Sequence, residues 1–247
     1  MPRLPLGKGK TAVLDYYFNH ETKKDVTGKT IQFHYVWDEL DNGGYSLFGN
    51  IFNRYGVQTK SQDAAPTLQN LKDANIYIIV DPDTEKESAH PNFVKEEDIN
   101  TIYDWVKKGG VLLLFSNDSG NAEFTHFNQL ATRFGIQFNY DSKNRVIGNN
   151  YEMGKISINA GNSIFKTAKQ VYLKEYSSLS IQTPAIAALK DGNTNVVAVA
   201  KIGKGTVFAV GDPWFYNEYT DGRKIPMDLG NYKAAEDLVK WAVQQIK

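Results

Sequence analysis

Acidic side chains follow several short apolar runs of this sequence at the point where each run ends. The acids in these positions are Asp15, Asp81, Asp118 and Asp212. Because the carboxyl ends of parallel strands meet at one edge of an open sheet, we expect these carboxylates to lie along a common rim. Carboxylates gathered in this way can bind hydroxyl groups, hold a cation or transfer protons.

Residues 211–219 form the densest functional candidate, because aromatic rings and acids alternate directly after a strand. Asp212 is followed by Trp214, Tyr216 and Glu218. Flat aromatic faces beside carboxylates suit a sugar, whose C–H faces stack on rings and whose hydroxyls bind the polar groups. The alternative is a tight turn in which Asp212 caps backbone amides and the rings pack inward.

A second polar segment follows the apolar run over residues 111–115 and leads into a predicted helix. Asn117 and Asp118 lie in it, and Glu123 and His126 share a helix face because they are three residues apart. These side chains could supply a general base, His126 or Glu123, oriented by Asp118. Capping of the helix by Asp118 or Asn121 is the structural alternative. A metal would need further ligands beyond the Glu-x-x-His pair, so we predict no metal and no cofactor.

Other polar residues carry weaker signals. Arg145 could bind the carboxylate of a uronic acid, or it could pair with Asp141 at the surface. Ser116 and Ser119 lack the Gly-x-Ser-x-Gly turn of a hydrolase nucleophile. His34 lies in a strand-like pattern, which favours a core or sheet-edge histidine over a catalyst.

The hydrophobic pattern predicts an α/β protein with a doubly wound, mostly parallel sheet. The expected strands cover residues 11–14, 32–37, 57–60, 76–80, 111–115 and 136–138, and the expected helices cover residues 45–55, 67–73, 96–108, 122–134 and 233–246. The succession of strands favours a flavodoxin-like order within a three-layer sandwich. Residues 141–194 lose the helical period, which predicts a mixed β addition. Residues 196–201 and 206–210 flank a Gly-Lys-Gly turn and predict a hairpin.

Length and composition fit one soluble α/β domain over residues 11–247, preceded by a linker or an expression-added start over residues 1–10. Lys plus Arg and Asp plus Glu each number 28, so no basic excess indicates a nucleic-acid partner. The absence of cysteine removes disulfides and thiolate chemistry. No apolar run predicts a membrane helix or a secretory signal, and the compartment stays open.

Five stretches together resemble a known module: residues 80–84, 109–114, 117–124, 144–146 and 210–214. The chain resembles the C-terminal domain attached to some bacterial unsaturated rhamnogalacturonyl hydrolases of glycoside hydrolase families 88 and 105. More broadly, it resembles the class I glutamine-amidotransferase-like, trehalose-utilisation-like superfamily. The resemblance implies a role in pectin or rhamnogalacturonan utilisation, which favours a periplasmic or extracellular location. The resemblance implies neither the hydrolase activity nor the amidotransferase activity for this chain. The hydrolases act through a separate helical barrel, and the amidotransferases use a cysteine.

The leading hypothesis is therefore a carbohydrate-associated domain that binds an acidic sugar or oligosaccharide at the rim. The predicted binding residues are Asp15, Asp81, Asn117, Arg145, Asp212, Trp214, Tyr216 and Glu218, with Asp118, Glu123 and His126 as the catalytic candidates. The second hypothesis is a glycan hydrolase that uses these catalytic candidates. The third is a module that docks a family 88/105 hydrolase domain of the same polypeptide, which predicts an exposed apolar patch.

Overall fold

The computed structural model describes residues 5–247. Residues 1–4 of the predicted linker lie outside the described part. Within that part, a short 3-10 helix, η1 (Pro5–Gly7), precedes the first strand, and the backbone amide of Gly7 donates to the carbonyl of Tyr55 at 2.8 Å.

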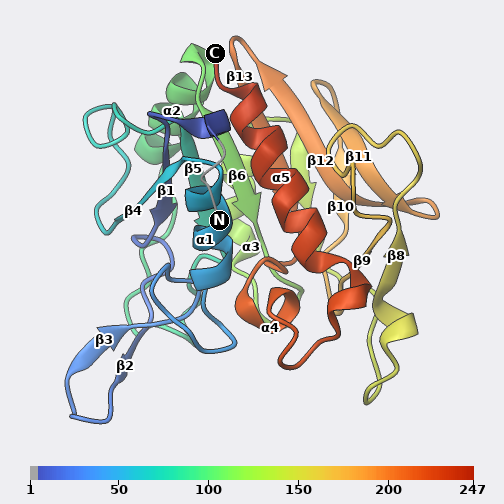
Figure 1. Ribbon diagram of the computed structural model, residues 1–247. Helices are drawn as coiled ribbons and strands as arrows, with labels where there is room; N and C mark the ends of the chain where they lie inside the picture. Colours follow the sequence, from blue (N-terminus) through green and yellow to red (C-terminus); the bar gives the residue numbers. More distant parts are fainter. Residues whose placement is uncertain (1–4) are drawn as a thin grey trace.

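A seven-stranded sheet forms the centre of the molecule (Figure 1). Its strands are β1 (Thr11–Asp15), β4 (Gln58–Gln62), β5 (Ile76–Val80), β6 (Val111–Phe115), β11 (Ala185–Asp191), β12 (Thr194–Ile202) and β13 (Gly205–Val210). Their order is β11-β12-β13-β6-β5-β1-β4. The strands from β13 to β4 run parallel, whereas β12 and β11 are antiparallel additions at one edge. The predicted α/β fold with a mostly parallel sheet is confirmed.

Helices cover both faces of the sheet, which explains why β5 and β6 are apolar along their whole length. The helices are α1 (Ser46–Arg54), α2 (Glu96–Lys108), α3 (Phe124–Thr132), α4 (Asn217–Thr220) and α5 (Asn231–Gln245). The buried faces of α1 and α5 share one hydrophobic core with alternate strand residues, and α2 and α3 share the other. In Figure 1, α1 and α5 accordingly lie in front of the sheet.

Strand β7 (Ile136–Phe138) corrects the predicted sheet order. It pairs with β10 (Leu179–Ile181) in a separate two-stranded sheet. The position beside β6 is taken by β13, from much later in the chain. Hydrophobic periodicity identifies a strand but does not identify its partner, so chain order was the wrong guide here.

Two further element predictions are wrong. The expected strand over residues 32–37 ends almost at once, because β3 (Thr30–Gln32) is followed by left-handed backbone at His34 and Tyr35, with φ of 65° and 56°. The expected helix over residues 67–73 is a succession of turns. In both places apolar side chains such as Tyr35 and Leu71 join the hydrophobic cores without belonging to a regular element.

Small β elements surround the main sheet. β2 (Thr22–Lys24) and β3 form an antiparallel arm that projects from the lower part of the molecule in Figure 1. β8 (Lys155–Ser157) and β9 (Gln170–Tyr172) pair beside the 3-10 helices η2 (Tyr151–Gly154) and η3 (Met227–Leu229). This confirms the predicted mixed β addition, and the pairing of β12 with β13 confirms the predicted hairpin.

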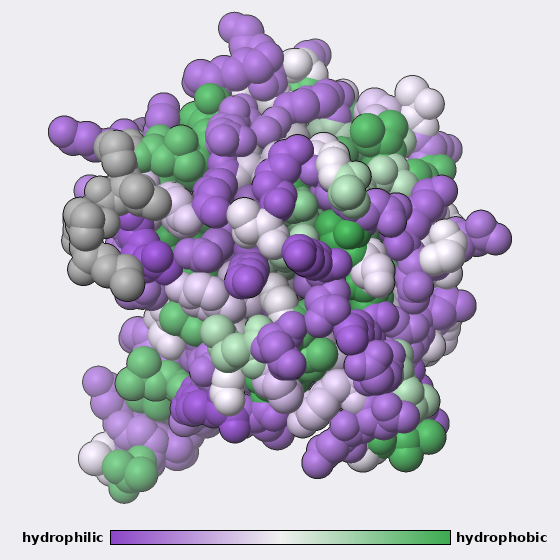
Figure 2. Space-filling model, turned by 45° about the vertical axis from the view of Figure 1, so that its right-hand side comes forward, coloured by the Kyte–Doolittle hydropathy of each residue, from purple (hydrophilic) through white to green (hydrophobic). Residues whose placement is uncertain are grey.

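The surface in Figure 2 is mostly hydrophilic, and its apolar residues are scattered over the face shown. The large apolar side chains that are exposed come from separate parts of the chain: Leu6, Val26, Leu40, Leu68, Tyr140, Ile147, Met153, Ile186 and Met227. Within residues 5–247, no helix is both long enough and apolar enough to span a bilayer.

Candidate functional site

The carboxyl ends of three neighbouring strands bring the polar candidates together. Strand β6 lies between β5 and β13, so the residues that follow these strands meet at one edge of the sheet. We call Asp81, Asn117, Asp118, Asp212 and Tyr216 the rim cluster. The predicted common rim is therefore present for the acids that follow β5, β6 and β13.

Asp81 is buried at the floor of the rim cluster and is held by two donors. Its Oδ2 accepts hydrogen bonds from Asn117 Nδ2 at 2.8 Å and from the Tyr35 hydroxyl at 3.2 Å. Its Oδ1 has no hydrogen-bond partner within residues 5–247. Burial raises the pKa of the Asp81 carboxyl to about 7, since removal from water penalises the charged form.

Asp212 occupies the corresponding position after β13. It is 4% exposed, and its Oδ1 also lacks a partner among the described residues. Burial raises the pKa of Asp212 well above its ordinary value; the Lys174 ammonium opposes this rise, and the carboxylates of Asp81 and Asp118 add to it. The raised pKa favours the protonated form of both floor acids relative to an exposed aspartate, and a protonated carboxyl can donate as well as accept.

Partly exposed side chains lie near these acids, and we call this group the mouth of the rim cluster. Asn117 and Tyr216 belong to the cluster itself, and Lys174 and Glu218 lie beside it. The Lys174 ammonium lies 3.9 Å from Glu218 Oε1, which also pairs with Lys224 at 3.3 Å. The mouth therefore offers a cation, an amide and a phenol above acids that retain protons.

Asp15 does not join the rim cluster. Its carboxylate accepts from the Tyr77 hydroxyl and from the backbone amides of Tyr17 and Phe18, at 3.1 and 2.7 Å. Burial raises its pKa to about 7. Because its acceptors are used to close the turn after β1, Asp15 has a structural role, and its assignment as a binding residue gains no support from these contacts.

Trp214 is fully buried, at 0% exposure, and cannot form the exposed sugar platform that the sequence predicted. Its ring packs on Phe215 with a centroid separation of 3.9 Å and lies near Phe165. The aromatics of this segment pack inward except Tyr216, which is partly exposed. The turn considered as an alternative is the better description of Trp214.

Glu123 and His126 lie at the start of α3, where Glu123 caps the helix. Glu123 is the N-cap residue of α3, and its carboxylate accepts from the backbone amides of His126 and Phe127 at 3.0 Å each. The His126 ring pairs with Glu123 at 3.1 Å and stacks on Phe93. The catalytic assignment of both residues stays a prediction, whereas the predicted cap moves from Asp118 or Asn121 to Glu123.

Asp118 closes the turn before that helix. Its Oδ1 accepts from Asn121 Nδ2 at 2.7 Å, and its backbone carbonyl accepts from the amides of Asn121 and Ala122. It is 7% exposed and lies close enough to Asp212 to raise the pKa of that acid. Asp118 therefore shapes the rim cluster electrostatically, and no described contact orients it toward His126.

Arg145 is exposed, and its loop runs beside the segment that carries Lys174. The backbones of Lys143 and Tyr176 form an isolated antiparallel β-bridge, and the amide of Glu175 donates to the carbonyl of Asn144 at 3.3 Å. Lys174, which the sequence analysis did not single out, acts electrostatically on Asp212 of the rim cluster, as His34 does on Asp81.

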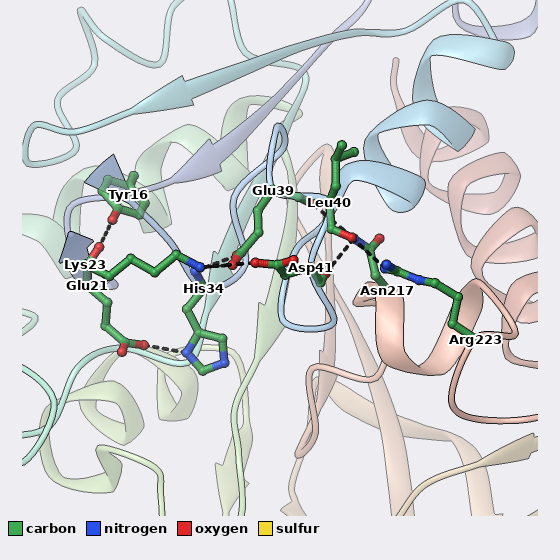
Figure 3. A network of polar contacts seen from close by, with 9 residues as sticks. All are labelled: Tyr16, Glu21, Lys23, His34, Glu39, Leu40, Asp41, Asn217 and Arg223. Atoms are coloured by element: carbon green, nitrogen blue, oxygen red, sulfur yellow. Dashed lines mark hydrogen bonds and ion pairs between the residues drawn. The ribbon is translucent and has the colours of Figure 1, made fainter. Parts of the chain in front are cut away.

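Sequence reasoning also missed the contacts that hold the β2–β3 arm and residues 33–44, which we call the covering loop; Figure 3 shows part of this network. The hydrogen bond from Tyr35 to Asp81 joins the covering loop to the rim cluster. The Nδ1 of His34 lies 2.5 Å from Glu21 Oε1, and the Lys23 ammonium reaches Glu39 at 3.2 Å. Asn217 binds the backbone carbonyls of Glu39 and Asp41 at 3.0 and 2.9 Å. These contacts join segments far apart in the sequence, and no local motif announces them.

A second pair of unpartnered polar side chains lies near the β1 end. Both side-chain amide atoms of Asn19 and the Oδ1 of Asp83 lack hydrogen-bond partners within residues 5–247. Burial raises the pKa of Asp83 to about 7. Nowhere in residues 5–247 is a group of three or more His, Cys, Asp or Glu side chains arranged to hold a metal ion.

Comparison with known proteins shows a shared fold. No family model and no curated protein matches the chain. Among solved structures, the mmIFT52 N-terminal domain is similar over 94% of this chain and 97% of its own, with a TM-score of 0.69 and 17% identity. The cytoplasmic protein STM1381 from Salmonella typhimurium LT2 gives 96% and 99% coverage, a TM-score of 0.63 and 12% identity.

A partial likeness extends to an enzyme. A β-galactosidase from Bacillus circulans sp. alkalophilus matches 82% of this chain but only 28% of its own, with a TM-score of 0.51 and 12% identity. At these identities the likeness describes the fold alone.

Proposed function

We propose that this chain is a carbohydrate-associated domain that binds an acidic sugar or oligosaccharide at the rim cluster. The observation that carries the proposal is the pair of buried carboxyls, Asp81 and Asp212, each with an oxygen that has no partner among the described residues. With their raised pKa values these groups can both donate to and accept from sugar hydroxyls. Asn117 and Tyr216 add an amide and a hydroxyl at the mouth.

The acidic character of the ligand rests on the cations at the mouth. Lys174 is partly exposed and faces Asp212, and Arg145 lies on the neighbouring loop. Because protons on the floor acids reduce their negative charge, a uronate carboxylate would meet Lys174 without strong repulsion from below. The link to pectin or rhamnogalacturonan, and to a family 88/105 hydrolase partner, rests on the sequence resemblance.

The strand order supports a finer description of the fold. The parallel strands follow the order β4-β1-β5-β6-β13, which corresponds to the flavodoxin-like order 2-1-3-4-5 when the strands are counted along the chain. We therefore keep the flavodoxin-like class as part of the proposal. The rim cluster lies outside the carboxyl ends of these strands, where ligands of such sheets bind.

Titration calorimetry with pectin-derived uronates and matched neutral sugars tests the function. We expect Lys174→Gln to weaken uronate binding by about tenfold and to leave neutral sugar binding unchanged, because only the uronate uses the ammonium. Lys166→Gln, an exposed lysine on another loop, is the matched control and should bind like the parent.

The proposal fails if the parent domain binds no sugar of the panel. An equal loss for uronate and neutral sugar in Lys174→Gln would remove the role of Lys174 in carboxylate recognition. Chromatography of the same mixtures after incubation would show cleavage products if the domain were a hydrolase.

A further inference from the structure

A glutamate and a histidine meet where the segment before β2 lies against the covering loop. Glu21 Oε1 lies 2.5 Å from His34 Nδ1, and the two side chains point toward each other in Figure 3. Because an ionised carboxylate only accepts hydrogen bonds, Nδ1 carries the ring proton, and the lone pair of the neutral ring lies on Nε2. A carboxylate that orients an imidazole in this way is a recurring part of hydrolytic active sites.

The other nitrogen of His34 lies at an open groove. Within residues 5–247 the Nε2 atom makes no hydrogen bond, and no dashed line reaches it in Figure 3. The groove has a volume of about 440 Å³, within the range of small-molecule sites. The His34 side chain is 30% exposed, so a molecule in the groove can reach the ring. We call it the arm groove, and its lining includes Lys23, His34, Glu39, Asp41, Gly43 and Arg223.

Gly43 leaves the Nε2 edge of the ring uncovered. A Cβ at this position would lie 2.9 Å from His34 Cδ2 and 3.6 Å from Nε2. The first of these distances is shorter than carbon atoms adopt in contact, so a larger residue would crowd this edge. The backbone amide of Tyr35 donates to the carbonyl of Gly43 at 2.8 Å, which fixes the glycine beside the ring. The accessible nitrogen therefore depends on a glycine at position 43.

The ring of His34 is held in place at a conformational cost. His34 and Tyr35 both have left-handed backbone, which is unfavourable for residues other than glycine and clusters at functional sites. The His34 ring stacks on the Phe33 and Tyr35 rings, with centroid separations of 5.8 and 3.9 Å. Its backbone amide donates to Glu39 at 2.7 Å. These contacts fix the orientation of the ring, as proton transfer at a defined atom requires.

The lining of the arm groove indicates the kind of reaction. Among the described residues that line it there is no serine, threonine or cysteine, so the nucleophile available to His34 is water. The cations Lys23 and Arg223 are already paired with carboxylates, which favours an uncharged reacting group. An ester is uncharged, and one base suffices for its attack by water. A glycosidic bond also needs an acid beside the leaving oxygen.

We propose that His34 is a catalytic general base with Glu21 as its positioning residue, and that the domain hydrolyses an ester carried by a sugar unit at the rim cluster. Nε2 takes a proton from water while the water oxygen bonds to the acyl carbon. The proton passes to the leaving oxygen as its bond to the acyl carbon breaks, which yields an acid and an alcohol and restores the ring. This inference rests on the proposed function for its sugar and adds a reaction to it. Tyr35, which stacks on His34 and donates to Asp81, joins the base to the rim cluster.

Release of acetate and methanol from O-acetylated and methyl-esterified galacturonate oligosaccharides tests the inference. The full chain is assayed against a protein-free blank, and the two products distinguish the two kinds of ester. We expect the parent to release one of them and His34→Gln to lower kcat/KM by at least about 100-fold, the scale of general-base catalysis. His90→Gln, an exposed histidine on another loop, is the matched control and should hydrolyse the ester like the parent.

The pH profile of Glu21→Gln distinguishes positioning from mere support of the fold. Burial lowers the pKa of His34, but the hydrogen bond to Glu21 and the nearby carboxylates outweigh it, so the pKa is raised. Because the neutral ring is the base, kcat/KM should rise with pH through this pKa. Glutamine still accepts the Nδ1 proton but has no charge, so the midpoint of the rise should move to lower pH. The other charged groups near the ring or in the groove are unchanged in this variant: Lys23, Glu39, Asp41, Asp81 and Arg223.

Each outcome separates this inference from the proposed function. If the parent binds uronates but releases neither product, the catalytic inference is overturned and the binding function stands. Hydrolysis without uronate binding would support His34 as the base and count against the proposed acidic ligand. Activity that persists in His34→Gln, or a midpoint that stays in place in Glu21→Gln, would overturn the assigned roles. Circular dichroism shows whether a variant is folded, and Glu21→Gln keeps the test decisive if His34→Gln does not fold.

Discussion

At the scale of single residues, the burial of carboxyl groups decides what the rim can do. The sequence correctly placed acids after β5, β6 and β13, because an apolar run followed by an acid is a local pattern. It could not separate Asp15, whose oxygens are used by its own turn, from Asp81 and Asp212, which keep an unpartnered oxygen. Neither could it show that Trp214 faces inward, since a ring beside an acid has the same pattern whichever way it points.

Asp81 gives a pH prediction with a definite sign. Its pKa is 3.8 in the ordinary state and about 7 when folded, so the folded protein holds a proton that the unfolded chain releases between these values. The protonated Asp81 therefore makes its full contribution to the free energy of unfolding below about pH 4, and this contribution is lost as the pH rises toward about 7. We expect Asp81→Asn, which stays neutral, to be more stable than the parent by a few kcal/mol at about pH 8 and by much less at about pH 5.

Urea unfolding at both pH values checks this prediction. Asparagine also tolerates the left-handed backbone at position 81, where φ is 41°. Asp63→Asn, at an exposed position, is the control and should show no pH-dependent difference. If Asp81→Asn is less stable than the parent at both pH values, the carboxyl is charged in the fold, and its proposed role as a proton-holding group fails.

At the scale of elements, the four longer helices were predictable and the N-cap of α3 was not. Periodicity located α1, α2, α3 and α5 because an amphipathic stripe is a property of the local sequence. The cap of α3 was assigned to the wrong residue, since Asp118, Asn121 and Glu123 all lie near the helix start and only backbone geometry selects Glu123. Strand β7 shows the same limit, because its pairing with β10 depends on the later chain.

Glu123→Ala tests whether this residue belongs to the helix or to the chemistry. Loss of the acceptor for the amides of His126 and Phe127 should lower the free energy of unfolding by about 1–2 kcal/mol. Sugar affinity should stay unchanged, because the cap does not contact the rim cluster in the structure. Thermal and urea unfolding measure the first effect, and calorimetry measures the second.

Glu97→Ala is the matched control, because Glu97 lies in the first turn of α2 and is exposed. Its effect on stability should be a few tenths of a kcal/mol at most. A Glu123→Ala variant with normal stability and lost sugar binding would restore Glu123 to the site.

At the scale of the whole molecule, the candidate site is assembled from both ends of the chain. Asn217 contacts residues that lie more than 150 positions away, and its amide binds the carbonyls of Glu39 and Asp41 and the hydroxyl of Ser46. Its Oδ1 accepts from the amide of Leu47 at 3.1 Å. Sequence alone cannot find such a clamp, because all partners but the Ser46 hydroxyl are backbone groups that any residue would supply.

Asn217→Ala should therefore loosen the covering loop while the sheet stays folded. Several buried hydrogen bonds are lost at about 1 kcal/mol each, so we expect destabilisation of about 3 kcal/mol. Amide exchange should accelerate over residues 33–44 and stay slow in β6, because the loop would open locally before the sheet unfolds. Hydrogen exchange followed by mass spectrometry measures both segments, and Asn149→Ala, at an exposed position, is the control.

The same variant connects the clamp to binding. If the loop held by Asn217 supports the rim cluster, the affinity for the uronates that bind the parent domain should fall together with the protection of residues 33–44. Unchanged exchange in these residues, with a uniform fall in protection across β6, would show that Asn217 stabilises the whole fold. The covering loop would then depend on Arg223 and Lys23, whose ion pairs and hydrogen bonds reach the same segment from the other two sides.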